Sequence, residues 1–381
     1  MSLSPFRPRL EVLEDRLTPA GHAPDVAAAN DGHLGQVAHS STLVVVRAAT
    51  ADDLAEQGQQ LINEGNYAAA VRVFSRLIAA QPTEVEGYRG RIEAELLLGR
   101  YSDAVGDYAR VTAYVEPVHP DAQNIILDGY TARLKASPTD VPALTGGSFA
   151  DWWYFKYASA THLLNQLLGL RPDDVYGNLF RGSSQLLSGA NKQEGVAGLA
   201  RAIALAPNSA DVHFIVADAY TYGSLPDPQR AFQEASLALQ GGLDTPRIHA
   251  ILANAYQAFG DPARAAAEIK KHIDLVTTDL RTTDPLAAGQ SLSVGLVPGR
   301  TYDIPLQLAA GEALSIRTSS PDFSDTILVL IGPHGTPVLG SDDFKKFFAG
   351  FDSTAQQAGT YHLLVTSFEG VSTGQLIVTR L

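Results

Sequence analysis

Two stretches of sequence 34 residues apart decide the fold: GNYAAAVRVF at residues 65–74 and GRYSDAVGDY at residues 99–108. Glycine, tyrosine, alanine and an aromatic residue recur at matching places, in the pairs Gly65 and Gly99, Tyr67 and Tyr101, Ala70 and Ala104, and Phe74 and Tyr108. Four matches at one spacing predict an internal repeat of 34 residues.

Each unit is expected to be a pair of antiparallel helices. Gly65 follows the first apolar face and offers the left-handed backbone that favours a helix end. Pro82 ends the second helix. The small side chain of Gly58 allows the two helices to approach closely, and Phe74 fills the gap to the next unit. One such pair cannot bury its apolar face alone, so the units are expected to stack.

Later units follow the same pattern less strictly. Residues 246–276 give a clear last unit, and residues 210–243 give one with an enlarged turn. Pro172 and Pro207, 35 residues apart, each follow an apolar helical run. We predict five units and a degenerate sixth between residues 51 and 278.

The degenerate unit is expected in the stretch 119–160. Helical spacing from Asp121 to Leu134 is followed by a break rich in proline and glycine, and then by Trp152-Trp153-Tyr154-Phe155. This aromatic cluster favours a core plug over a platform for sugar binding.

The block 51–278 resembles the tetratricopeptide-repeat (TPR) family. The resemblance implies an α-solenoid in which the first helix of each pair lines a groove for a protein or peptide partner. Groove residues are expected to be Gln59, Arg89, Glu93, Phe180, Phe214, Asp218, Asn254 and Gln257. The alternative is that they form an ordinary solvated face. The lysine and asparagine clamp of chaperone-binding members is absent, which disfavours that role.

After residue 278 the helical spacing gives way to alternation of apolar and polar residues, with turn signals between short segments. The apolar run Ile327–Ile331 is typical of a strand covered on both faces. Residues 285–381 are therefore predicted to form an antiparallel β-sandwich, giving a multidomain α + β chain.

This segment resembles the bacterial pre-peptidase C-terminal (PPC) domain, a jelly-roll-like module. The motifs that carry the resemblance are LAAGE (308–312), DFSDT (322–326), IGPHG (331–335), SDD (341–343) and GTYHLLV (359–365). It implies an extracellular accessory or binding role, with calcium in some members, and it does not imply protease activity.

Four aspartates could supply oxygen ligands to Ca²⁺: Asp322, Asp325, Asp342 and Asp343. The alternative is that aspartates in turns accept hydrogen bonds from their own backbone. No loop with EF-hand spacing supports the metal, so no cofactor is expected beyond this candidate.

Residues 1–50 are expected to hold a short amphipathic patch, with Leu10, Leu13 and Leu17 on one face, and then a flexible linker. The segment RPRLEVLEDRLTPA (7–20) resembles the N-terminal sorting segment of exported proteins of envelope-rich bacteria, which implies export to the envelope or exterior. The alternative is a frayed terminus without a role.

Composition narrows the function classes. The net charge is −13 and no block is basic, which disfavours nucleic acid as a partner. The chain has no cysteine, which excludes disulfides and thiol nucleophiles, and it has no apolar run long enough to span a membrane as a helix. Zinc-protease, serine-hydrolase and phosphate-loop motifs are absent. His213 and His249 share one place in their units, where a structural role between helices is favoured over catalysis.

The sequence thus predicts a non-enzymatic scaffold that binds a protein or peptide. The alternative is a surface-binding protein that recognises a cell-surface glycan or calcium through the β-sandwich. An enzyme of unfamiliar type is the third hypothesis.

Overall fold

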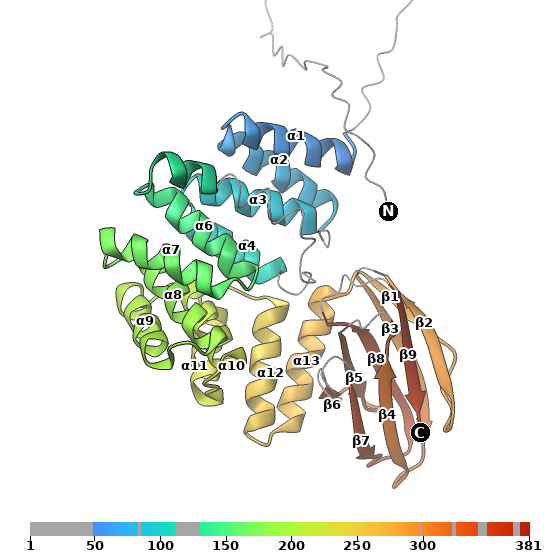
Figure 1. Ribbon diagram of the computed structural model, residues 1–381. Coiled ribbons are helices and arrows are strands. Elements are labelled where there is room, and N and C mark those ends of the chain that lie inside the picture. The colour runs from blue at the N-terminus through green and yellow to red at the C-terminus, as the bar shows by residue number, and fades with distance from the viewer. Residues whose placement is uncertain are drawn as a thin grey trace, which may run out of the picture. The chain divides into compact units, whose positions relative to one another are not determined.

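The computed structural model describes residues 49–82, 85–111, 130–297, 299–321, 325–341, 349–368 and 374–381. The predicted N-terminal sorting segment lies outside the described residues. Among these residues the last helix ends at Val276, and strands follow from Asp279 onward (Figure 1). An α-solenoid followed by a β-sandwich is therefore confirmed as the fold class.

The helices form consecutive pairs. Their bounds are α1 Ala51–Asn63 and α2 Tyr67–Ala80, α3 Val85–Leu97 and α4 Tyr101–Val111, α6 Val141–Trp153 and α7 Tyr157–Leu170, α8 Val175–Ser188 and α9 Lys192–Leu205, α10 Ala210–Tyr222 and α11 Pro228–Gln240, and α12 Pro246–Ala258 and α13 Pro262–Val276. In Figure 1 they run from blue α1 to the orange-yellow α13.

The contact predicted for Phe74 is confirmed. The ring is 1% exposed and lies between two glycines, Gly58 of its own pair and Gly90 of the next. A Cβ atom at Gly58 would stand 2.5 Å from the ring, and one at Gly90 would stand 2.2 Å from it. The aromatic ring therefore replaces side chains on both neighbouring helices and sets their spacing.

Side-chain caps fix where several helices begin. Asp227 and Asp261 precede prolines, and each accepts a hydrogen bond of 3.0 Å from the backbone N–H three residues on. Proline suits the first helical turn because its missing N–H would have no partner there. These local signals explain why α11 and α13 start where they do.

The break predicted before the Trp152 cluster is confined to residues 137–140, and its extension through Gly146 and Gly147 is wrong. Residues 141–153 form the continuous helix α6, capped by Asp140, whose side chain accepts from the Ala143 N–H at 3.1 Å. Gly146 lies within this helix. The position requires glycine, because a Cβ atom there would stand 2.5 Å from the Tyr130 ring. The glycine thus serves close packing between helices instead of interrupting one.

The strands form two sheets. Their bounds are β1 Asp279–Thr282, β2 Ser291–Leu296, β3 Arg300–Leu308, β4 Ala313–Ser319, β5 Thr326–Ile331, β6 Pro337–Ser341, β7 Gly350–Thr354, β8 Gly359–Ser367 and β9 Gly374–Arg380. One sheet has the order β1-β3-β8-β5-β6 and the other β2-β9-β4-β7. All described pairings are antiparallel except that of β1 with β3, which is parallel.

Strand β5 is buried on both faces, as its apolar run predicted. Leu328 and Leu330 point into the core of the sandwich. Ile327 and Val329 join a second cluster with residues of α12 and α13, among them Ile269. The solenoid therefore ends on the outer face of the five-stranded sheet, and its last helix shares a core with that sheet.

Two contacts fix α13 against the sheet. Ile269 lies over Gly340 of β6, where a Cβ atom would stand 2.8 Å from the Ile269 side chain. The imidazole of His272 is fully buried, with Nδ1 2.9 Å from the Pro246 carbonyl oxygen and Nε2 2.8 Å from that of Phe368. Burial lowers the pKa of His272 from 6.5 to about 4, although both carbonyl contacts act in the opposite direction.

We expect this histidine to make the fold sensitive to acid. Between pH 6.5 and 4 the unfolded chain binds a proton at His272 that the folded chain excludes, so acid favours unfolding. The contribution amounts to about 3 kcal/mol over that range. We compare the free energy of unfolding of the natural chain with that of His272→Gln, measured by urea unfolding. Between pH 7 and pH 4 the natural chain should lose stability relative to the variant by that amount. A difference that does not change with pH would contradict this assignment.

Candidate functional site

Five of the eight predicted groove residues lie on α8, α10 and α12. These helices and α6 form a row of first helices in which each helix contacts the next. We call this row the first-helix face. Phe180 of α8 and Phe214 of α10 lie on it but are only 1% and 0% exposed. Their assignment as groove-lining residues is wrong, because other side chains of the same chain cover them.

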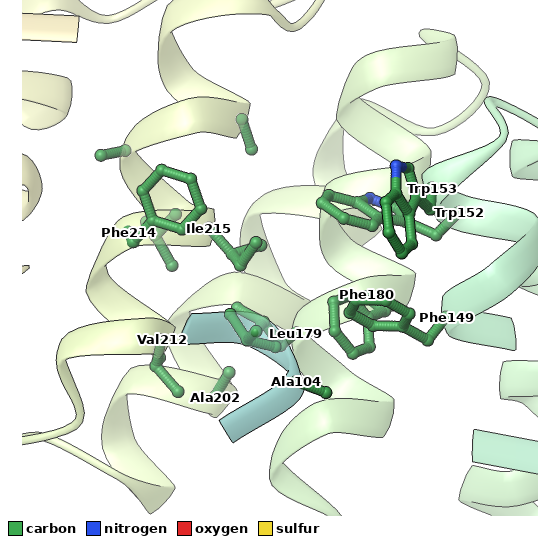
Figure 2. Packing of buried hydrophobic residues seen from close by; sticks show 14 of the residues in the cluster. Ala104, Phe149, Trp152, Trp153, Leu179, Phe180, Ala202, Val212, Phe214 and Ile215 are labelled. Carbon is green, nitrogen blue, oxygen red and sulfur yellow. The ribbon is translucent and has the colours of Figure 1, made fainter. Parts of the chain in front are cut away.

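Aromatic side chains provide this cover. The Phe180 ring centroid lies 5.1 Å from that of Phe149 and 5.2 Å from that of Trp152, both on α6. The Phe214 ring centroid lies 6.4 Å from that of Tyr108 on α4. Figure 2 shows the rings of Phe149, Trp152, Trp153 and Phe180 gathered together. The predicted core role of the two tryptophans is confirmed, since they are 3% and 6% exposed.

Tyr108 joins α4 to this aromatic cluster. Its ring centroid lies 4.9 Å from that of Trp152 and 5.4 Å from that of Trp153, both edge to face. Edge-to-face rings attract one another beyond the effect of burial alone. Ala104 and Val105 of α4 are fully buried in the same core, and α4 also contacts α10 and α12. Helix α4 therefore lies against the first-helix face.

The position of α4 follows from extra residues between α3 and α6, which lengthen the spacing of this unit beyond 34 residues. Gly90 and Gly146 occupy matching places in α3 and α6 but are 56 residues apart. The ring of Tyr130, in the helical residues 130–136, lies against Gly146 as Phe74 lies against Gly90. Residues 130–136 thus occupy the second-helix place before α6, and α4 is left to pack elsewhere.

The sequence held a signal for this arrangement. The stretch QPTEV at residues 81–85 recurs as SPTDV at residues 137–141, directly before α6. Alignment on these two stretches, instead of on Gly65 and Gly99 alone, marks α4 as an extra helix.

Three predicted residues lie near the other end of the solenoid. Gln59 on α1 and Arg89 and Glu93 on α3 are all half-buried. Burial raises the pKa of Glu93 to about 7, and the neighbouring charge of Arg89 partly offsets this effect. The structure thus places Arg89 and Glu93 close enough to interact and assigns no contact between them and Gln59.

The predicted residues of α10 and α12 form a connected group. Asp218 is 6% exposed and accepts a hydrogen bond of 2.9 Å from Arg247 Nε. The Arg247 guanidinium lies 3.9 Å from the centroid of the Tyr222 ring, and Asn254 Nδ2 lies 3.3 Å from the Tyr222 hydroxyl. We call Tyr222, Arg247 and Asn254, with Asp218 beneath them, the Arg247 patch. Gln257, three residues beyond Asn254 on α12, is exposed.

Helix α4 lies close to this patch, since it contacts both α10 and α12. The charges of Asp218 and Arg247 act in opposite directions on the Tyr108 hydroxyl, and burial raises the pKa of Tyr108 well above its ordinary value. Tyr222 remains 39% exposed. The patch therefore combines an anchored arginine with an accessible tyrosine ring, the two residue types that most often dominate protein interfaces.

The two histidines lie between helices, as predicted. His213 is 4% exposed, with Nδ1 2.5 Å from Glu234 Oε2 and Nε2 2.9 Å from the Pro207 carbonyl oxygen. His249 is 3% exposed, with Nδ1 2.6 Å from Glu268 Oε2. Each histidine thus links the first helix of its pair to the second.

The calcium candidate receives no support from the described residues. Asp322, Asp342 and Asp343 lie outside them. Asp325 precedes β5, and its backbone carbonyl oxygen accepts a hydrogen bond of 3.0 Å from the Phe368 N–H. Within the part of the chain that the structure describes, no three acidic, histidine or cysteine side chains are grouped to hold a metal ion. Among the same residues no helix has the length and apolarity needed to cross a bilayer.

Comparison with known proteins supports the repeat. The family model of the tetratricopeptide repeat matches residues 56–120. A tetratricopeptide repeat protein from Parabacteroides merdae is similar in structure, with 15% identity, 60% of this chain and 80% of that chain covered, and a TM-score of 0.37. The match of the family model shows that the chain contains tetratricopeptide repeats.

Two other solved structures resemble parts of the chain. Pseudomonas aeruginosa pilF has 15% identity and a TM-score of 0.34, with 59% of this chain and 91% of that chain covered. The pre-peptidase C-terminal domain of a collagenase from Bacillus anthracis has 11% identity and a TM-score of 0.23, with 27% and 95% covered. At these values neither likeness bears on function.

Removing the Tyr108 ring should loosen the solenoid. We expect Tyr108→Ala to lower the free energy of unfolding by about 2–3 kcal/mol, because the ring is half-buried against several aromatic neighbours. The two tryptophans of the chain, Trp152 and Trp153, both contact this ring, so their fluorescence during urea unfolding reports the change. Phe259→Ala, at a ring that is 44% exposed, is the control and should cost less than 1 kcal/mol. Equal losses in both variants would contradict the packing of α4.

Proposed function

We propose that this protein is a protein-interaction scaffold whose solenoid binds a protein or peptide partner through the Arg247 patch. The observation that carries the proposal is the fixed arrangement of Arg247 over Tyr222. Asp218 holds the guanidinium from one side, so the arginine loses little rotamer freedom when a partner binds. Tetratricopeptide repeats are commonly protein-binding modules, which agrees with this role.

The proposed binding surface is smaller than the groove that the sequence suggested. Phe180 and Phe214 are covered, so the middle of the first-helix face offers no accessible aromatic rings at those positions. Tyr222, Asn254 and Gln257 remain accessible toward the C-terminal end of the solenoid. A peptide with a carboxylate for Arg247 and an apolar side chain for the Tyr222 ring fits this chemistry.

We also propose that the protein acts in the bacterial envelope or exterior. The basis is the resemblance of residues 7–20 to a sorting segment, together with the PPC-like pattern of residues 285–381. Detection of the full chain in envelope or culture fractions, with loss of that location when residues 1–20 are deleted, would test it.

A second candidate is surface binding through the sandwich. A cavity of about 200 Å³ opens beside the ends of β3, β4 and β5, lined by apolar side chains such as Leu308 and Leu314 and by the ring of Tyr361. Its size suits one side chain or a part of one sugar unit. Titration of the full chain with cell-wall glycan fragments and with Ca²⁺, with and without Tyr361→Ala, separates this role from partner binding by the solenoid.

The scaffold proposal predicts a specific loss of partner capture. With the full chain as bait in envelope extract, Tyr222→Ala should reduce recovery of a specific partner at least tenfold. Tyr256→Ala is the matched control, because Tyr256 lies on α12 and also has an arginine over its ring, Arg264 at 5.7 Å. Capture of the same proteins in the same amounts by all three chains would overturn the patch as the binding surface.

A further inference from the structure

A polar cleft lies between α3 and α4 on one side and the start of α10 on the other. Its volume is about 550 Å³, and Gly241 and Gly242 of the turn before α12 complete its wall. The cleft exists because α4 reaches α10 instead of following the regular stacking of second helices. It shares no lining residue with the Arg247 patch.

Carboxylates outnumber guanidinium groups in the lining. The acidic side chains are Glu95, Asp103, Asp107 and Asp211, and the basic ones are Arg91, Arg100 and Arg110. This balance disfavours an anion as the occupant, since the nearest carboxylates would repel it.

Most of these charges are already paired. Asp107 accepts hydrogen bonds from Arg91 Nε at 2.5 Å and from Arg91 Nη2 at 2.7 Å. Asp103 accepts from Arg100 Nε at 2.7 Å. Asp211 accepts from the Tyr176 hydroxyl at 2.6 Å. Three of the four carboxylates therefore have their partners within the protein.

Glu95 is different from the other three. The residue is 3% exposed, and its Oε2 has no hydrogen-bond partner among the described residues. Its Oε1 lies 3.9 Å from Arg100 Nη2, which is too long for a hydrogen bond. A buried polar atom without a partner destabilises the fold, so its presence on the wall of a cleft calls for an explanation.

We propose that the cleft between α3, α4 and α10 binds an organic ammonium group, which donates a hydrogen bond to Glu95. The group is either a free primary amine or the side chain of a lysine in a peptide, since both present the same N–H donors on a short apolar stem. Arg91 and Arg100 balance the charges of Asp107 and Asp103, so ionised Glu95 supplies the net negative charge of the site. Within the described residues no metal-type grouping of ligands competes for it.

Binding should be linked to the titration of Glu95. Burial raises the pKa of Glu95 to about 8, with further effects from Asp107 and Asp103, which raise it, and Arg91 and Arg100, which lower it. Asp211 of α10 and Arg110 of α4 are the other charged residues that line the cleft with Glu95. An ammonium ion favours ionised Glu95, so binding near pH 7 releases a proton from the protein.

Calorimetry on the full chain tests the proposal. The probes are n-butylammonium chloride and the peptide acetyl-Gly-Lys-Gly-amide, with n-butanol as the uncharged control of equal shape. We expect saturable binding of at least one ammonium probe, no binding of n-butanol, and an affinity that rises at least tenfold between pH 6 and pH 8. Repetition at pH 7 in buffers of different ionisation enthalpy should show release of close to one proton per bound probe.

Two variants separate Glu95 from the general negative charge of the protein. Glu95→Gln should weaken ammonium binding at pH 8 at least tenfold and abolish its pH dependence. This variant should remain folded and gain stability at pH 8, because it removes a buried charge. Glu86→Gln, at an exposed carboxylate on the same helix, should change nothing.

The pattern of binding identifies the source of the group. Binding of n-butylammonium alone indicates a small amine, and tighter binding of the peptide indicates a lysine side chain. Absence of saturable binding by both ammonium probes, equal binding of n-butanol, or unchanged binding by Glu95→Gln would overturn the proposal.

Discussion

The packing of α4 against the first-helix face is the contact on which the rest of this structure depends. Tyr108 reaches rings on α6 and α10, which are 41 or more residues further along the chain. Because one helix contacts several repeats at once, the middle of the array becomes a closed core. An ordinary solenoid stabilises each repeat mainly through its neighbours. Here a helix also connects repeats that are not adjacent.

Because the middle of the array is covered, the two candidate binding surfaces lie at two edges of the core. On one edge, the arginine of the Arg247 patch lies beside the covered rings and donates a hydrogen bond to Asp218. On the other edge, α4 and the start of α10 enclose a polar cleft with Glu95 on its wall. Both surfaces are consequences of the same helix position, although they differ in charge and in the ligand that each suits.

The sandwich shares a hydrophobic core with the last helices of the solenoid, so it is not an independent domain at the end of the chain. Ile327 and Val329 of β5 share a cluster with α13, while Leu328 and Leu330 share one with the opposite sheet. A spacer of stacked helices with a freely attached binding module would not bury both faces of this strand. Buried His272 connects the two regions further, since it contacts the backbone of α12 at Pro246 and that of the sandwich at Phe368.

Sequence reasoning predicted the helix pairs, the change to strands after residue 278 and the doubly covered strand, because each depends on local periodicity. It failed for Phe180 and Phe214, since exposure at a given repeat position depends on what a distant helix covers. It also missed α6, where Gly146 looked like a break but makes room for Tyr130. Phe155 shows a further limit. It has a φ of 59° and is 64% exposed at the turn where other pairs use glycine, and no local rule predicts it.

Hydrogen–deuterium exchange of the full chain tests the central claim most directly. If the apolar face of α4 is part of the common core, the amides of residues 104–108 should be protected to the same degree as those of α10, and both should exchange only through global unfolding. Exchange of the α4 amides several orders of magnitude faster than those of α10, under the same conditions, would show that the first-helix face is open and would contradict the account.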